Sequence, residues 1–269
     1  MKPLRIAVCL KQVLDPELPP ASFRIDAEGL RPDVPGAPLV MDSYAANALE
    51  VGLKLREQVA GSTLTVFCVG DERADEVIRQ AFEVTADEGV RAWDPGWERL
   101  DALATAHILA RAIVTAGGAD VVLCGREAGD IEEGLVGPAL AEELDAACVT
   151  VAERVAPGGP NDWLVVEKRG RSGLLRLAAE PPLVVTITST KDNVLRMAKV
   201  KDKMLARRKR VRVVGAGELG LDPARARPRT ELCALTLAES RGTCQWITGA
   251  DGAELAAQLV RRLRELKLC

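Results

Sequence analysis

The stretch from residue 119 to residue 145 constrains the fold more than any other part of this chain. Asp120 to Cys124 is a short apolar run with β-branched residues, which predicts a strand buried on both faces. The run ends at Gly125 in a polar loop, and Gly134 to Leu144 then carries apolar residues at helical spacing. A strand, a glycine-bearing loop and a helix N-terminus together form an anion cradle, because unpaired amides and the helix dipole point beyond the strand. A nucleotide phosphate would suit this position.

The same pattern also has a plainer interpretation. Strand-loop-helix units occur in every α/β domain, and this loop has neither a Walker lysine-serine pair nor the G-x-G-x-x-G spacing. The local pattern therefore leaves an ordinary α/β loop open as the alternative to a phosphate site.

Strands and helices alternate through the first half of the chain. The expected strands are 4–10, 64–69, 89–92 and 120–124, and the expected helices are 41–58, 75–84, 101–116 and 134–144. This alternation predicts an α/β fold with a mostly parallel sheet, flanking helices and right-handed crossovers. Because the carboxyl ends of parallel strands meet at one edge, we expect Cys9, Cys68 and the loop at Asp130 to approach one crevice of the kind that binds nucleotides.

The sequence pattern changes after residue 148. Residues 149–155, 163–168, 170–177 and 183–188 are expected strands that extend the same sheet with antiparallel partners. Residues 15–38 are rich in Pro, Asp and Gly, which predicts an excursion with a small hairpin. Residues 253–268 have the pattern of an amphipathic helix. We expect an α/β nucleotide-binding core over 1–213, and a C-terminal arm and helix over 214–269 that pack on a partner subunit.

Composition limits the classes of partner. The chain has 36 basic and 39 acidic residues, a net charge of −3, and only 3% aromatic residues, which argues against a nucleic-acid surface. The run from Arg207 to Arg212 is a local basic patch that could face an acidic partner or nucleic acid, and we favour the partner.

Cysteine usage and the N-terminus indicate the compartment. The seven cysteines are odd in number and none is spaced as C-x-x-C, so neither a disulfide framework nor a metal site is indicated. Lys11 interrupts the first apolar run, which is too short for a signal peptide. We expect reduced thiols in a cytoplasmic protein.

Several stretches, in order along the chain, resemble the β subunit of electron transfer flavoproteins, the ETF β or FixA-like family. They are VCLKQVLD (8–15), MDSYAANALEVGLKLRE (41–57), CVGDERADEVIRQAFEVTADEGV (68–90), GREAGDIEEGLVGPALAEEL (125–144), PPLVVTIT (181–188) and DNVLRMAKVKDKMLARRKR (192–210). The similarity covers roughly Leu4 to Arg210 and the C-terminal helix. It implies a Rossmann-like domain of the adenine-nucleotide α-hydrolase-like type.

The resemblance implies an electron carrier subunit that is not itself an enzyme. In this family the β subunit pairs with an α subunit that holds the redox-active FAD. The pair shuttles electrons from a flavin-dependent acyl-CoA or related dehydrogenase to a downstream quinone reductase or ferredoxin-type acceptor. The β crevice usually holds AMP, and a second FAD takes that place in electron-bifurcating members.

The resemblance also implies site residues. Nucleotide contacts would come from Cys9, Asp42, Cys68, Asp130, Glu133, Gly134, Leu135 and Val136. Tyr44 falls where the family has an aromatic residue near the isoalloxazine of the α-bound flavin. Partner docking would involve Arg196, Met197, Val200 and Met204, with Val200 in the place of a leucine that anchors partner dehydrogenases in some members.

Two departures leave the occupant of the crevice open. Glu133 and Leu135 stand where the family has hydroxyl and amide donors. A carboxylate about 4 Å from a phosphate costs about 4 kcal/mol at an effective dielectric constant near 20. AMP, a second FAD and an empty crevice therefore all remain open.

A non-redox nucleotide-binding regulatory module of similar fold is the alternative to a carrier subunit. A hydrolase lacks a catalytic set, because no nucleophile accompanies Glu132, Glu133 or the lone His107.

Overall fold

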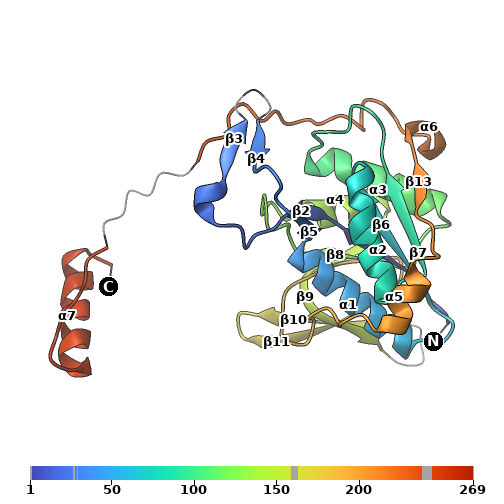
Figure 1. The fold of residues 1–269 in the computed structure, drawn as a ribbon. Helices are drawn as coiled ribbons and strands as arrows, with labels where there is room; N and C mark the ends of the chain where they lie inside the picture. The colour runs from blue at the N-terminus through green and yellow to red at the C-terminus, as the bar shows by residue number, and fades with distance from the viewer. Residues whose placement is uncertain (1, 27, 29, 159–162, 238–243, 269) are drawn as a thin grey trace.

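A nine-stranded sheet forms the centre of the computed structural model, which describes residues 2–26, 28, 30–158, 163–237 and 244–268 (Figure 1). The strand order is β11-β10-β9-β12-β8-β1-β6-β7-β13. The strands are β1 (Arg5–Leu10), β6 (Thr63–Val69), β7 (Glu88–Ala92), β8 (Val121–Gly125), β9 (Ala147–Pro157), β10 (Leu164–Gly170), β11 (Gly173–Ala179), β12 (Leu183–Ile187) and β13 (Arg212–Val214). The pairs on both sides of β1 are parallel, whereas β10 is antiparallel to β9 and β11. The predicted mostly parallel α/β sheet with an antiparallel extension is confirmed.

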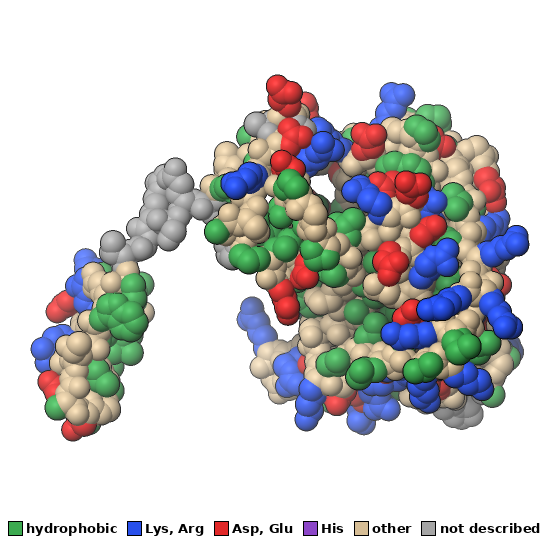
Figure 2. Space-filling model, in the orientation of Figure 1, with side chains coloured by type: hydrophobic (Ala, Val, Ile, Leu, Met, Phe, Trp, Pro, Cys, Tyr) green, Lys and Arg blue, Asp and Glu red, His purple; other side chains and the backbone are tan. Residues whose placement is uncertain are grey.

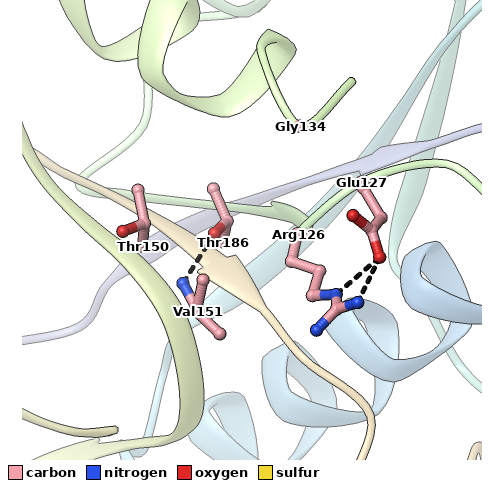
Figure 3. A pocket seen from close by; sticks show the side chains of 6 residues that line it. All are labelled: Arg126, Glu127, Gly134, Thr150, Val151 and Thr186. Carbon is pink, nitrogen blue, oxygen red and sulfur yellow. Dashed lines mark hydrogen bonds and ion pairs between the residues drawn. The ribbon is translucent and has the colours of Figure 1, made fainter. Parts of the chain in front are cut away.

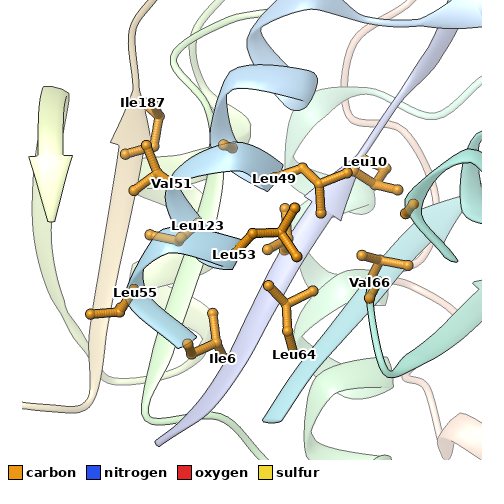
Figure 4. Packing of buried hydrophobic residues seen from close by; sticks show 14 of the residues in the cluster. Ile6, Leu10, Leu49, Val51, Leu53, Leu55, Leu64, Val66, Leu123 and Ile187 are labelled. Carbon is orange, nitrogen blue, oxygen red and sulfur yellow. The ribbon is translucent and has the colours of Figure 1, made fainter. Parts of the chain in front are cut away.

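Helices cover both faces of the sheet. One buried cluster holds side chains of α1 (Ser43–Gln58) and α2 (Asp75–Glu83), and a second holds those of α3 (Ala102–Thr115) and α4 (Val136–Glu143). Figure 4 shows α1 lying across β1, β6 and β8, with Leu49 and Leu53 directed to the strands. Along β1, Ile6 and Val8 join the α1 cluster, while Ala7 and Cys9 join the α3 cluster. Because both faces are covered there, central strands such as β1 and β8 are almost continuously apolar.

The smaller elements lie at the edges of this core. They are the strand pairs β2 (Gln12–Leu14) with β5 (Leu39–Met41) and β3 (Arg24–Asp26) with β4 (Arg31–Asp33), the 3-10 turns η1 (Pro20–Ser22) and η2 (Glu72–Ala74), and the helices α5 (Val200–Ala206), α6 (Ala216–Leu219) and α7 (Gly252–Glu265). The pair β3–β4 confirms the hairpin predicted within residues 15–38. No helix among the described residues is long and apolar enough to cross a membrane.

The helix predicted to begin at Gly134 begins instead at Val136. Glu132 and Gly134 have φ values of 58° and 65°, in the left-handed region, so the backbone turns there before it can enter a right-handed helix. The polar loop is therefore two residues longer than expected.

The C-terminal part of the chain stays on the core beyond residue 213. Val214 of β13, Leu219 of α6 and Ala226 are buried in the α3 cluster. By contrast, α7 has no buried residue and lies apart from the sheet in Figure 1. The division into a core over 1–213 and an arm over 214–269 stays a prediction.

Close packing of α4 on β12 requires a glycine at position 137. A Cβ atom there would lie 2.3 Å from Cγ2 of Thr186, a residue that is 2% exposed and bonded through its hydroxyl to the Val151 amide. We predict that Gly137→Ala lowers the free energy of unfolding by about 1–3 kcal/mol, because α4 must shift away from the sheet. Urea denaturation measures this change.

Gly217→Ala is the matched control for this substitution. No atom lies within 4 Å of a Cβ at position 217 in α6, so this change should leave stability unchanged or slightly raised. Equal unfolding midpoints for the two variants would contradict the tight contact between α4 and β12.

Candidate functional site

The crevice lies where the chain order reverses in the sheet. β1 pairs with β6 on one side and with β8 on the other, and the loop from Arg126 to Leu135 leaves the carboxyl end of β8 beside the N-terminus of α1. Ligands of open α/β sheets bind at such a switch point.

Asp42 fastens the loop to α1. Its Oδ1 atom accepts hydrogen bonds from the amides of Tyr44 (3.0 Å) and Ala45 (3.1 Å), and its Oδ2 atom accepts one from the amide of Gly129 (2.8 Å). Asp42 is 2% exposed, so its carboxylate is committed to backbone amides of this chain. The bond to Gly129 spans 87 positions and has no local signal in the sequence. The nucleotide contact predicted for Asp42 stays a prediction.

An ion pair joins the two sides of the crevice. Lys11, which follows β1, lies 2.6 Å from Oδ1 of Asp130 in the loop after β8. The two side chains are 41% and 39% exposed, so Asp130 keeps access to solvent. A ribose hydroxyl could reach its carboxylate without displacing buried groups.

Cys9 and Cys68 present no side chain to a ligand. They belong to clusters on opposite faces of the sheet and are 7% and 1% exposed. Burial raises the pKa of Cys9 well above its ordinary value and that of Cys68 to about 12, so both stay protonated thiols. Any ligand contact at these two positions would come from the backbone.

A cation lies over the aromatic ring at the N-terminus of α1. The guanidinium carbon of Arg126 is 4.9 Å from the ring centroid of the half-buried Tyr44. Arg126 also forms an ion pair with Glu127, whose hydrogen bond raises the pKa of Arg126. Gly125 allows this approach, because a Cβ there would lie 2.7 Å from that of Tyr44. The arrangement gives a planar, charged wall beside the crevice.

A pocket of about 420 Å³ adjoins the loop (Figure 3). It is lined by Arg126, Glu127, Gly134, Thr150, Val151 and Thr186. Val151 has a φ of 58°, unusual for a β-branched residue, and its amide donates to Oγ1 of Thr186 at 2.9 Å. Strained backbone of this kind gathers at functional sites, and the volume is that of a small-molecule pocket. Of these six residues the sequence indicated only Gly134. Thr150 and Val151 lie at a bulge in β9, and such a bulge leaves no recognisable pattern in the sequence.

The residues at the start of α4 fit an anionic group. Leu135 occupies the N-cap without a side-chain hydrogen bond, so the first amides of α4 have no cap. Glu132 and Glu133 oppose an anion, but both are exposed and solvent screens them. Leu135 is 52% exposed and Val136 is half-buried. The carboxylates of Glu132 and Glu133 would weaken the binding of a phosphate at these amides.

The four residues predicted for docking divide into two kinds. Met197, Val200 and Met204 are 94%, 78% and 64% exposed. Arg196 instead bonds to Glu50 and Glu57 of α1. Glu50 was missed from the sequence, although a carboxylate among the apolar positions of α1 was the available signal.

Together these features define a class of protein, an α/β protein with a crevice at the switch point of its sheet and an exposed apolar segment around Met197 and Val200. A family model described as the electron transfer flavoprotein domain matches residues 36–219. The electron transfer flavoprotein subunit beta of Thermoanaerobacterium thermosaccharolyticum is 33% identical over 221 residues, and that of Mycobacterium tuberculosis is 32% identical over 225 residues. Each alignment covers 81% of both chains.

The Protein FixA of Sinorhizobium fredii is 29% identical over 224 residues, which cover 81% of this chain and 76% of that protein. The chain belongs to the electron transfer flavoprotein family. The predicted resemblance is thereby confirmed.

Loss of the Asp42 carboxylate should loosen the loop as well as destabilise the chain. We predict that Asp42→Ala lowers the free energy of unfolding by about 2–4 kcal/mol, because it removes a helix cap and leaves the Gly129 amide without its partner. Amide hydrogen exchange over residues 126–135 should become faster.

Asp251→Ala is the matched control, since Asp251 caps the exposed α7 through the Glu254 amide. It should leave exchange over 126–135 unchanged. Unchanged exchange in Asp42→Ala as well would show that Asp42 does not hold the loop.

Proposed function

We propose that this chain is the β subunit of a heterodimeric electron transfer flavoprotein. The observation that carries the proposal is the similarity to proteins named as that subunit along 81% of the chain. In the proposed role the chain is a carrier subunit, and the FAD that accepts and donates electrons belongs mainly to the α subunit. Electrons come from a flavin-dependent acyl-CoA or related dehydrogenase and leave to a quinone reductase or ferredoxin-type acceptor.

The chain's own residues would bind and orient groups without reacting. Tyr44, with Arg126 over its ring, would border the flavin of the partner. The uncapped amides of α4, with Gly134 and Val136, would hold a phosphate, and Asp130 would accept a hydrogen bond from a ribose hydroxyl. AMP is the favoured occupant, and a second FAD is the alternative.

The C-terminal arm would pack on the α subunit. The exposed apolar side chains of α7 include Leu255, Leu259 and Val260, which are 37%, 47% and 42% exposed. Leu255 and Leu259 are four residues apart and share one face of the helix. A helix with an apolar face and no buried residue needs a partner surface.

Co-expression with an electron transfer flavoprotein α subunit from the same genome tests the proposal. We predict that the two chains co-purify as a complex with the visible absorption spectrum of bound flavin. The purified chain alone should be colourless if its crevice holds AMP. A complex without flavin would contradict the carrier role and favour the non-redox regulatory module.

Replacement of Glu133 tests the phosphate position. Two exposed unit charges about 4 Å apart in water repel by about 1 kcal/mol, so Glu133→Thr should tighten AMP binding about fivefold in titration calorimetry. Glu142→Gln removes the same charge at the far end of α4 and should leave the Kd unchanged.

An equal Kd for Glu133→Thr and the unaltered chain would place the Glu133 carboxylate away from the phosphate. Absence of AMP binding in both would remove AMP as the occupant.

A further inference from the structure

The docking segment, residues 193–206, is bonded to α1 at its N-terminal end. The Arg196 guanidinium donates to both carboxylate oxygens of Glu50, each at 3.0 Å, and the Arg196 amide donates to Oε2 of Glu50 at 3.1 Å. Arg196 also bonds to Glu57, about two turns further along the same face of α1. Glu50 is 4% exposed, so its charge needs compensation, which Arg196 supplies together with Lys54, whose Nζ lies 3.8 Å from Oε1 of Glu50.

A second anchor lies three residues earlier. The Asn47 side chain of α1 donates to the Asn193 carbonyl at 2.9 Å, and the Asn193 side chain donates to the Glu153 carbonyl at 2.8 Å. Asn193 is 3% exposed. Two polar anchors, the buried Asn193 and the half-buried Arg196, therefore enclose a two-residue span.

The side chains next to these anchors are unusually exposed. Val194 is 67% exposed and Met197 is 94% exposed. The segment contains neither proline, which would restrict its backbone, nor glycine, which would make it more flexible. The bonds to α1, together with the packing of Leu195 and Ala198 on the core, hold these apolar side chains outward.

Charge around the segment indicates the partner's surface. Residues 191–212 contain ten Lys or Arg and two Asp. Figure 2 shows basic side chains gathered around hydrophobic ones over the region of α5. The matching partner surface is an apolar socket with an acidic rim.

We infer that Arg196 is a positioning residue, which holds the docking segment on α1 so that Met197 and Val200 are presented to the acidic-rimmed socket of the dehydrogenase. The inference rests on the proposed carrier function. All three guanidinium nitrogens of Arg196 bond to Glu50 or Glu57, so a direct contact with the partner would require breaking them. A segment released from α1 must be ordered again at each encounter, which weakens docking without changing the electron transfer that follows.

The experiment uses the complete α/β pair as electron acceptor of the acyl-CoA dehydrogenase, from the same genome, that gives the lowest KM with the unaltered pair. Arg196→Gln should raise the KM about tenfold and change kcat by no more than about twofold. Ordering the released segment lowers the affinity for the dehydrogenase but does not slow electron transfer within the complex. Hydrogen exchange over residues 192–199 should become faster in this variant.

Two control variants distinguish a positioning role of Arg196 from a direct contact with the dehydrogenase and from a general loss of positive charge. Met197→Ala should raise the KM with exchange over 192–199 unchanged. Lys199→Gln removes one exposed charge from the same segment and should change neither exchange nor kcat. If Arg196→Gln fails to fold, Glu57→Gln breaks only the outer ion pair, with a carboxylate 51% exposed, and should give a smaller change in the same two readouts.

The inference is overturned if Arg196→Gln leaves the KM unchanged, or raises it without faster exchange. A different result would contradict the docking role on which the inference rests. If Met197→Ala and Val200→Ala both leave the KM unchanged, the docking role of the segment itself is wrong.

Discussion

The bond between the Asp42 carboxylate and the Gly129 amide joins the two parts of the chain that form the crevice. The same carboxylate caps α1, so the position of the loop is fixed relative to the helix that packs across β1, β6 and β8. A buried acceptor with three amide donors has little freedom to move, because each lost bond leaves a buried polar group without its partner. The loop after β8 is therefore held in place before any ligand arrives.

Helix α1 connects the crevice with the docking segment. Its N-terminus carries Asp42 and Tyr44, its apolar face packs on the sheet, and Asn47, Glu50 and Glu57 hold residues 193–196. One rigid helix thus sets the geometry of both regions. In the proposed function this places the wall beside the flavin and the surface for the dehydrogenase on a single support, which suits a carrier that must align two redox partners.

The sequence predicted the features that depend on local pattern. Alternating apolar runs and amphipathic helices indicated the parallel sheet, and the motifs between residues 8 and 210 indicated the family. What it missed depends on contacts between distant residues, such as Arg196 with Glu50 and Lys11 with Asp130. The bulge at Val151 and the left-handed Glu132 and Gly134 were missed because neighbouring strands and loops impose those conformations.

The central claim is that the crevice of this chain holds an adenine nucleotide while its sister chain carries the flavin. Native mass spectrometry of the co-expressed pair, followed by dissociation into single chains, tests it most directly. The account predicts one copy of each chain, with this chain released at the mass of its polypeptide plus an adenine nucleotide, and the sister chain with FAD. A pair in which neither chain carries a bound group, or two chains that form no complex, would contradict it.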